Sequence, residues 1–132
     1  MNRATGYSAV VEEHFANPRH AGMLEGQYPV TLHGRAGQRE YGTEVAFHVG
    51  ADDVRIIAMT FQAFGCPHTI AACSVLVERL TGCPVESLGE VRFDRLAADL
   101  GLPAEKTGRL LIIEDALRKC RAAWDNRRLG RR

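Results

Sequence analysis

The chain has 132 residues, of which 45% are hydrophobic and 25% charged, and its formal net charge at neutral pH is +1. These values are typical of one globular domain with its own hydrophobic core. They argue against a membrane-spanning protein, because no apolar run approaches the length that a bilayer requires.

The N-terminal residues and the cysteine spacing indicate in which cellular compartment the protein is expected. The first eight residues lack the apolar segment of a secretory signal, so we expect a cytoplasmic protein. The four cysteines, Cys66, Cys73, Cys83 and Cys120, show no CxxC spacing. They therefore resemble neither a disulfide framework nor a zinc-binding quartet.

Basic residues gather at the C-terminal end. Seven of the 17 lysines and arginines lie from residue 118 onward, where Asp125 is the one acidic residue. We predict a single domain over residues 1–126 and a solvated basic tail over residues 127–132. An electrostatic contact with a partner is the alternative. We expect no nucleic-acid binding, because no aromatic residues interleave with the tail charges.

The first predicted element is a helix over residues 7–17. Ser8 is a capping residue at its start, and the pair Asn17-Pro18 ends it. Its apolar stripe is formed by Val10, Val11, His14 and Phe15. We expect His14 to be packed within this stripe rather than to bind a ligand.

Two long strands follow a shorter one. Val30–His33 is the short strand candidate, and the glycine-containing segment Gly34–Gly42 is expected to be a polar loop. Thr43–Val49 and Val54–Phe64 alternate in polarity and are joined by a hairpin connection at residues 50–53. The expected inward faces are Val45, Phe47 and Val49 on one strand and Ile57, Met59, Phe61 and Ala63 on the other. His48 falls on the polar face, where it needs no special role.

The second half of the chain is helical. A helix after Cys66 has an apolar stripe at Ile70, Cys73, Val77 and Leu80. A short helix from Phe93 to Leu100 stops at Gly101, and a last helix begins near Pro103 and Thr107. Its stripe is Leu110, Ile113, Leu117, Cys120 and Trp124. This order predicts an α+β domain, a small antiparallel sheet of about three strands with helices packed on one face.

Cys66 is the candidate functional residue. Gly65 ends the preceding strand, and Pro67 is suited to the first turn of a helix. A cysteine at a helix N-terminus is favoured as a thiolate, which is a nucleophile and a metal ligand. His68 adds a second ligand or a proton acceptor. The alternative is a small residue in a turn, followed by a solvated histidine.

Four stretches together resemble the IscU/NifU-type iron–sulfur cluster assembly scaffolds. Tyr7-Ser8, His14-Phe15, Asn17-Pro18-Arg19 and Gly22 are similar to the family's opening helix and NPR turn. Ala63-Phe64-Gly65-Cys66 with Thr69-Ile70-Ala71 is similar to its YGCGSAIA-like segment. Leu102-Pro103-Ala104-Glu105-Lys106 lies where the family has an LPPVK-like chaperone-recognition segment. Ile113-Glu114-Asp115-Ala116-Leu117 resembles its C-terminal helix. The implied fold agrees with the α+β prediction.

The family binds its cluster through three cysteines, helped by an aspartate and a histidine, and here only Cys66 carries over. The family's first cysteine aligns near Arg39, and its His-Cys pair aligns with Gly108-Arg109. Arg39 and Arg109 would thus stand where thiolates belong. We expect both cations to lower the pKa of Cys66 and to bind a small anion such as a carboxylate, a phosphate or a persulfide.

The resemblance implies an iron–sulfur cluster assembly protein of the scaffold type, and not an enzyme. It would bind iron, a cluster or sulfur at Cys66 with help from His68. Its implied partners are a cysteine desulfurase and an Hsp70-type chaperone. One alternative is a degenerate relative that acts as an adaptor, a regulator or a sulfur acceptor without holding a cluster. Another is an enzyme with Cys66 as nucleophile, His68 as base and the arginines as anion clamps.

Overall fold

Residues 7–129 are described by the computed structural model, and they form one three-stranded sheet and four α-helices. The helices are α1 (Ala9–Ala16), α2 (Pro67–Leu80), α3 (Phe93–Leu100) and α4 (Gly108–Leu129). The strands are β1 (Val30–Gln38), β2 (Thr43–Ala51) and β3 (Ile56–Phe64). Short 3-10 turns are η1 (Arg39–Tyr41), η2 (Val85–Gly89) and η3 (Ala104–Lys106).

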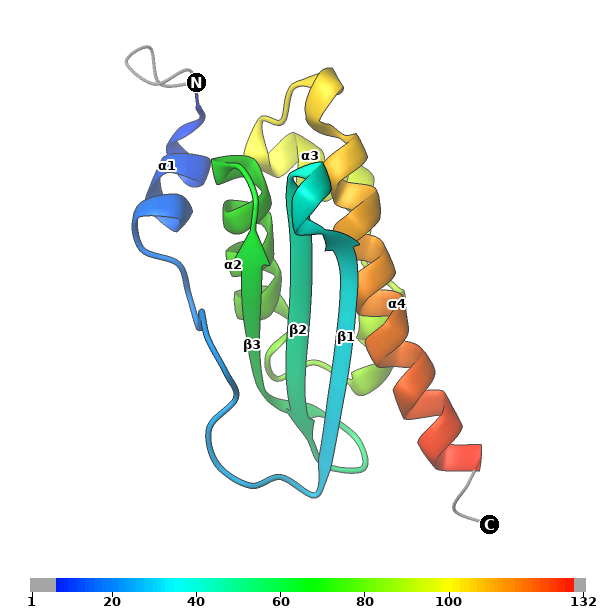
Figure 1. Cartoon of the computed structure of the whole chain (residues 1–132). Coiled ribbons are helices and arrows are strands. Elements are labelled where there is room, and N and C mark those ends of the chain that lie inside the picture. Colours follow the sequence, from blue (N-terminus) through cyan, green and yellow to red (C-terminus); the bar gives the residue numbers. More distant parts are fainter. Residues whose placement is uncertain (1–6, 130–132) are drawn as a thin grey trace.

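The sheet is an antiparallel meander in the order β1-β2-β3 (Figure 1). β1 pairs with β2 from Val30 opposite Ala51 to Gln38 opposite Thr43. The predicted hairpin of two long antiparallel strands corresponds to β2 and β3, and it is confirmed. The predicted α+β class is also confirmed.

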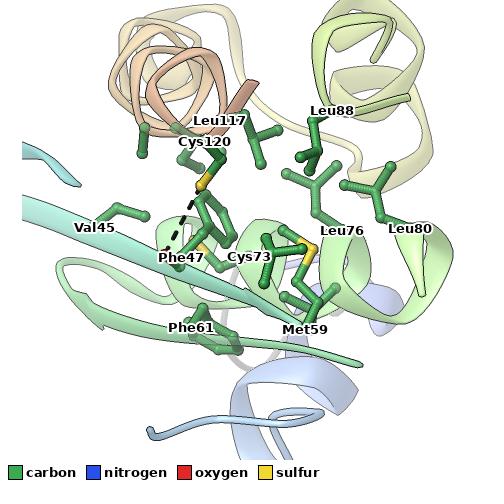
Figure 2. Packing of buried hydrophobic residues seen from close by; sticks show 14 of the residues in the cluster. Val45, Phe47, Met59, Phe61, Cys73, Leu76, Leu80, Leu88, Leu117 and Cys120 are labelled. Atoms are coloured by element: carbon green, nitrogen blue, oxygen red, sulfur yellow. Dashed lines mark hydrogen bonds between the residues drawn. The ribbon is translucent and has the colours of Figure 1, made fainter. Parts of the chain in front are cut away.

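The helices α2 and α4 cover one face of the sheet, and α1 packs against α2 (Figure 1). Figure 2 shows the core between sheet and helices, where Phe47 and Met59 meet Leu76 and Leu117. The Cys120 thiol points to the Phe47 carbonyl oxygen, with 3.9 Å between sulfur and oxygen. The predicted apolar positions of α4, from Leu110 to Trp124, are all buried. Burial of such side chains is the main favourable contribution to folding.

The predicted loop over Gly34–Gly42 is wrong, because β1 continues to Gln38. Gly34 is needed there for close packing and not for a turn. A Cβ at Gly34 would collide with the Ala116 carbonyl oxygen and lie 2.9 Å from the Cys120 backbone nitrogen. The glycine thus lets β1 lie directly against α4.

The predicted start of the third strand at Val54 is also wrong. β3 begins at Ile56, and the register with β2 shifts between Gly50 and Ala51. Because such a bulge changes which side chains point inward, Ile56 is buried while Ile57 is exposed. The inward positions Met59 and Phe61 are as predicted.

The N-terminal helix is shorter and less buried than its pattern indicated. Ser8 caps α1 by accepting a hydrogen bond from the Val11 backbone N–H at 3.2 Å. Val11 and His14 are buried, but Val10 and Phe15 of the expected stripe are exposed. The packed position expected for His14 is confirmed.

At the other end, α4 runs to Leu129 and so includes the first residues of the expected basic tail. Residues 1–6 and 130–132 of the sequence lie outside the described part. Across residues 7–129, no helix has the length and apolar character that crossing a membrane requires.

Candidate functional site

Cys66 occupies the N-cap position of α2, as the sequence predicts. Its backbone is extended, with φ −78° and ψ 169°, and Pro67 is the first residue of the helix. The Cys66 carbonyl oxygen accepts a hydrogen bond from the Ile70 N–H at 3.2 Å. The thiol is therefore at the end of α2 where backbone N–H groups point outward.

Several groups act together on the Cys66 sulfur. Burial, the largest single influence, would raise the pKa of Cys66. It is outweighed by the Thr69 hydroxyl, whose oxygen is 3.6 Å from the sulfur, by the N–H groups of Thr69 and His68, and by the charge of Arg109. The pKa of Cys66 consequently lies below that of an ordinary thiol, and the half-buried sulfur is favoured as a thiolate.

Arg109 and Arg39 differ in their surroundings, although both align with positions at which the family has cysteines. Arg109 is the second residue of α4, and its positive charge lowers the pKa of both Cys66 and His68. Its Nε atom is buried and has no hydrogen-bond partner among residues 7–129. Arg39 in η1 is paired with Glu44 at 3.2 Å, and its guanidinium lies 5.1 Å from the centre of the Phe64 ring.

His68 is buried rather than solvated. Only 4% of it is exposed, and its ring meets the Tyr7 ring edge-on with 4.8 Å between centroids. Burial lowers the pKa of His68, and the charges of Lys106 and Arg109 lower it further. Its Nδ1 atom is buried without a hydrogen-bond partner in the described part of the chain. A neutral imidazole with a free nitrogen is the form of histidine that binds metals.

The other cysteines occupy different environments. Cys73 and Cys120 are completely buried, and burial raises the pKa of Cys73 strongly and that of Cys120 to about 12. The half-buried Cys83 donates its thiol hydrogen to the Arg79 carbonyl oxygen at 3.3 Å. In contrast to the two buried thiols, Cys66 has an environment that lowers its pKa.

The donor atoms do not gather into a full metal site. Residues 7–129 contain no group of three or more histidine, cysteine, aspartate or glutamate side chains that could hold a metal ion. Cys66 and His68 are therefore at most two donors within one chain, whereas an iron–sulfur cluster is usually held by four.

The sequence analysis assigned Thr69 and Lys106 no influence on the pKa of Cys66 or His68. Thr69 is the third helical residue after the N-cap, a position whose side chain returns to the cap residue in capping boxes, and this spacing was a usable signal. The influence of Lys106 on His68 had no local signal, because it depends on how η3 packs near the start of α2. These groups all belong to the upper end of the molecule in Figure 1, where α2 and α4 begin.

The chain is similar to known proteins over most of its length. The family described as the NifU-like N-terminal domain matches residues 6–130. An iron–sulfur cluster assembly scaffold protein IscU from Rickettsia prowazekii is 31% identical, covering 92% of this chain and 94% of the relative. The IscU scaffold protein of Azotobacter vinelandii is 29% identical, covering 85% and 90% of the two chains.

Solved structures show the same fold. A putative iron–sulfur cluster assembly scaffold protein for the SUF system from Fervidobacterium islandicum superposes with a TM-score of 0.64. It is 15% identical, and the match covers 89% of this chain and 97% of the other. The N-terminal part of a NifU-like protein from Brucella abortus gives a TM-score of 0.54 at 16% identity, covering 89% and 82%.

Proposed function

Because the chain belongs to the NifU-like N-terminal domain family, we propose that it takes part in iron–sulfur cluster assembly through Cys66. The observation that carries this proposal is the environment of the Cys66 thiol. It is half-buried at a helix N-terminus, and Thr69, two backbone N–H groups and Arg109 favour its thiolate. Thiolates are the groups that bind iron in such clusters.

The few donor atoms at Cys66 and His68 support only a limited role for this chain in holding iron or a cluster. Cys66 supplies one thiolate, and the buried His68, whose Nδ1 atom has no hydrogen-bond partner among residues 7–129, is the candidate for a second donor. Two donors leave the coordination of iron incomplete, so the other ligands would come from a small thiol or a second protein. We therefore expect iron or a cluster to be held only transiently by a single chain.

The same thiolate favours a second function, in which Cys66 accepts sulfur and holds no cluster. The Cys66 thiolate would attack the outer sulfur of a persulfide on a cysteine desulfurase. A new sulfur–sulfur bond forms between Cys66 and the transferred sulfur. The sulfur–sulfur bond of the donor persulfide breaks, and the donor cysteine leaves as a thiolate. The electrons balance without another oxidant, and the charge of Arg109 would stabilise the resulting anionic persulfide.

A cysteine desulfurase and an Hsp70-type chaperone are the partners that we propose. The segment Leu102–Lys106, which resembles the chaperone-recognition segment of the family, carries the exposed residues Ala104 and Glu105. A chaperone could contact this part of the segment without unfolding the domain. Direct binding of each purified partner to the full chain would test this proposal.

One experiment addresses both functions. The full chain is incubated anaerobically with iron, cysteine and a cysteine desulfurase, and iron, sulfide and the mass of each cysteine-containing peptide are then measured. We expect either iron with sulfide or one added sulfur atom at Cys66 in the unmodified chain, and neither in Cys66→Ser. Cys83→Ser is the matched control, since Cys83 is also half-buried, and it should behave as the unmodified chain. Equal loading of Cys66→Ser would refute the role of Cys66.

A further inference from the structure

The face of the sheet opposite α2 and α4 carries a chain of hydrogen bonds that links all three strands. His33 of β1 lies directly opposite His48 of β2, with 2.9 Å between their Nδ1 atoms. The His48 Nε2 atom is 2.9 Å from the Gln62 Oε1 atom of β3. Although His48 was expected to have no special role, it is the central member of this chain and is only 6% exposed.

The Gln62 carbonyl oxygen determines which atoms donate and which accept along this chain of hydrogen bonds. A carbonyl oxygen only accepts, so the His48 Nε2–H must donate to it. The Nδ1 atom of a neutral His48 then accepts from the Nδ1–H of His33. The Nε2 atom of His33 takes part in neither of these two hydrogen bonds. His48 and Gln62 are thus positioning residues for the His33 ring.

A basic cavity lies beside this pair. It has a volume of about 490 Å³, and its polar lining side chains are His33, Arg35, His48 and Lys119. None of the described residues that line it is acidic. Its volume lies within the range of small-molecule sites.

The two cationic side chains that line the cavity, Arg35 and Lys119, come from different elements. Lys119 reaches from α4 to β1, where its ammonium group donates to the Arg35 carbonyl oxygen at 2.7 Å. Within residues 7–129, Arg35 takes part in no ion pair. Glu44, which lines the adjoining cavity together with Arg35, is paired with Arg39. Among the described residues, no carboxylate therefore pairs with the charge of Arg35.

We propose that this cavity binds a small oxyanion, a phosphate or carboxylate group, through Arg35 and Lys119. The guanidinium fork matches the geometry of both groups, and charge-assisted hydrogen bonds are the stronger kind. The proposal is independent of the function proposed for Cys66, since neither Cys66 nor Arg109 lines the cavity.

The test is calorimetric titration of the full chain with inorganic phosphate and, separately, with succinate, at constant ionic strength because salt screens such contacts. The two arms distinguish a phosphate site from a carboxylate site. Arg35→Gln should weaken binding by about tenfold or more, as expected for the loss of a charge-assisted hydrogen bond. Arg118→Gln is the control, since it removes the same charge from an exposed residue of α4. Far-ultraviolet circular dichroism establishes that each variant is folded.

Sulfate gives a second readout as a third small oxyanion of similar geometry. We expect it to bind the unmodified chain, and to bind Arg35→Gln more weakly than Arg118→Gln. Equal binding to Arg35→Gln and Arg118→Gln, or no binding of any of the three anions, would overturn the proposal. So would preferential binding of Zn²⁺ or Ni²⁺ that is lost in His33→Gln, because the histidine pair would then be a cation site.

Discussion

The Thr69 hydroxyl oxygen lies 3.6 Å from the Cys66 Sγ atom, at the third position of the helix that Cys66 caps. Because this hydroxyl helps to offset the effect of burial on the thiol, Thr69→Val should raise the pKa of Cys66. We expect alkylation of Cys66 near neutral pH to become several-fold slower, since the thiolate is the reacting form. The measurement is the pH dependence of iodoacetamide labelling, followed by peptide mass spectrometry.

The control is Thr81→Val at the opposite end of α2. The Thr81 hydroxyl donates to the Val77 carbonyl oxygen at 2.7 Å and has no contact with Cys66. Its loss should leave the labelling rate of Cys66 unchanged. A Cys66 that titrates at or above the ~8.5 of a free thiol in the unmodified chain would contradict the thiolate assignment.

The two arginines should have unequal effects on the same thiol. Arg109→Gln removes a positive charge that lowers the pKa of Cys66, so labelling near neutral pH should slow. Arg39→Gln removes a cation that is already paired with Glu44, and its effect should be smaller. Labelling rates of the two variants, measured side by side, check this order. The reverse order would place Arg39 and not Arg109 as the important cation at Cys66.

The attachment of α1 depends on one buried serine. The Ser74 hydroxyl oxygen accepts from the Arg19 backbone N–H at 2.7 Å, and the hydroxyl is also hydrogen-bonded to the His14 Nδ1 atom at 2.7 Å. Ser74→Ala leaves both groups without this partner, so we expect a loss of about 1–3 kcal/mol in the free energy of unfolding. Urea denaturation measures it. A double-mutant cycle with His14→Asn should show coupling, whereas additive effects would mean that the two side chains do not interact.

The same histidine makes stability depend on pH. Burial lowers the pKa of His14, and the Arg19 charge lowers it further. Below the unfolded value of about 6.5 the unfolded chain therefore binds more protons, so the free energy of unfolding decreases as the pH falls toward the folded pKa. The pKa of His68 is lowered by burial first, and its contribution has the same sign.

His14→Asn should flatten this dependence in part, because an amide can hydrogen-bond with Ser74 without titrating. His20→Asn is the matched control, since it makes the same substitution at an exposed residue. Urea denaturation at a series of pH values provides the slopes. A slope that His14→Asn leaves intact would assign the pH dependence to other groups.

Two glycines should respond in opposite ways to alanine. Gly34→Ala places a Cβ against the Ala116 backbone of α4, and this rigid contact should cost about 3 kcal/mol or more. At Gly108, the first residue of α4, a Cβ meets no described atom within 4 Å, and alanine should stabilise by about 0.4–1 kcal/mol. Thermal denaturation of both variants measures the difference. A Gly34→Ala chain of unchanged stability would show that α4 does not pack this closely on β1.

Local patterns predicted most elements of the fold correctly. Ser8 and Gly101 mark the start of α1 and the end of α3, and both signals act through groups within a few residues. Alternation placed Val45, Phe47 and Val49 on the buried face of β2. Pro67 located the start of α2 and therefore the N-cap position of Cys66.

The sequence by itself determined the element types, the α+β class, the family resemblance and the position of the candidate thiol, because caps and hydrophobic periods are local. Only the tertiary structure decided that β1 runs through Gly34, since that glycine is explained by contacts with Ala116 and Cys120 of α4, far along the chain. The same holds for the inward turn of His68, the effect of Arg109 on Cys66 and the bonding of His33 to His48. In each case the residues that meet are not related by a helix or strand repeat along the sequence. Strand register and helix packing therefore decide which of them come into contact.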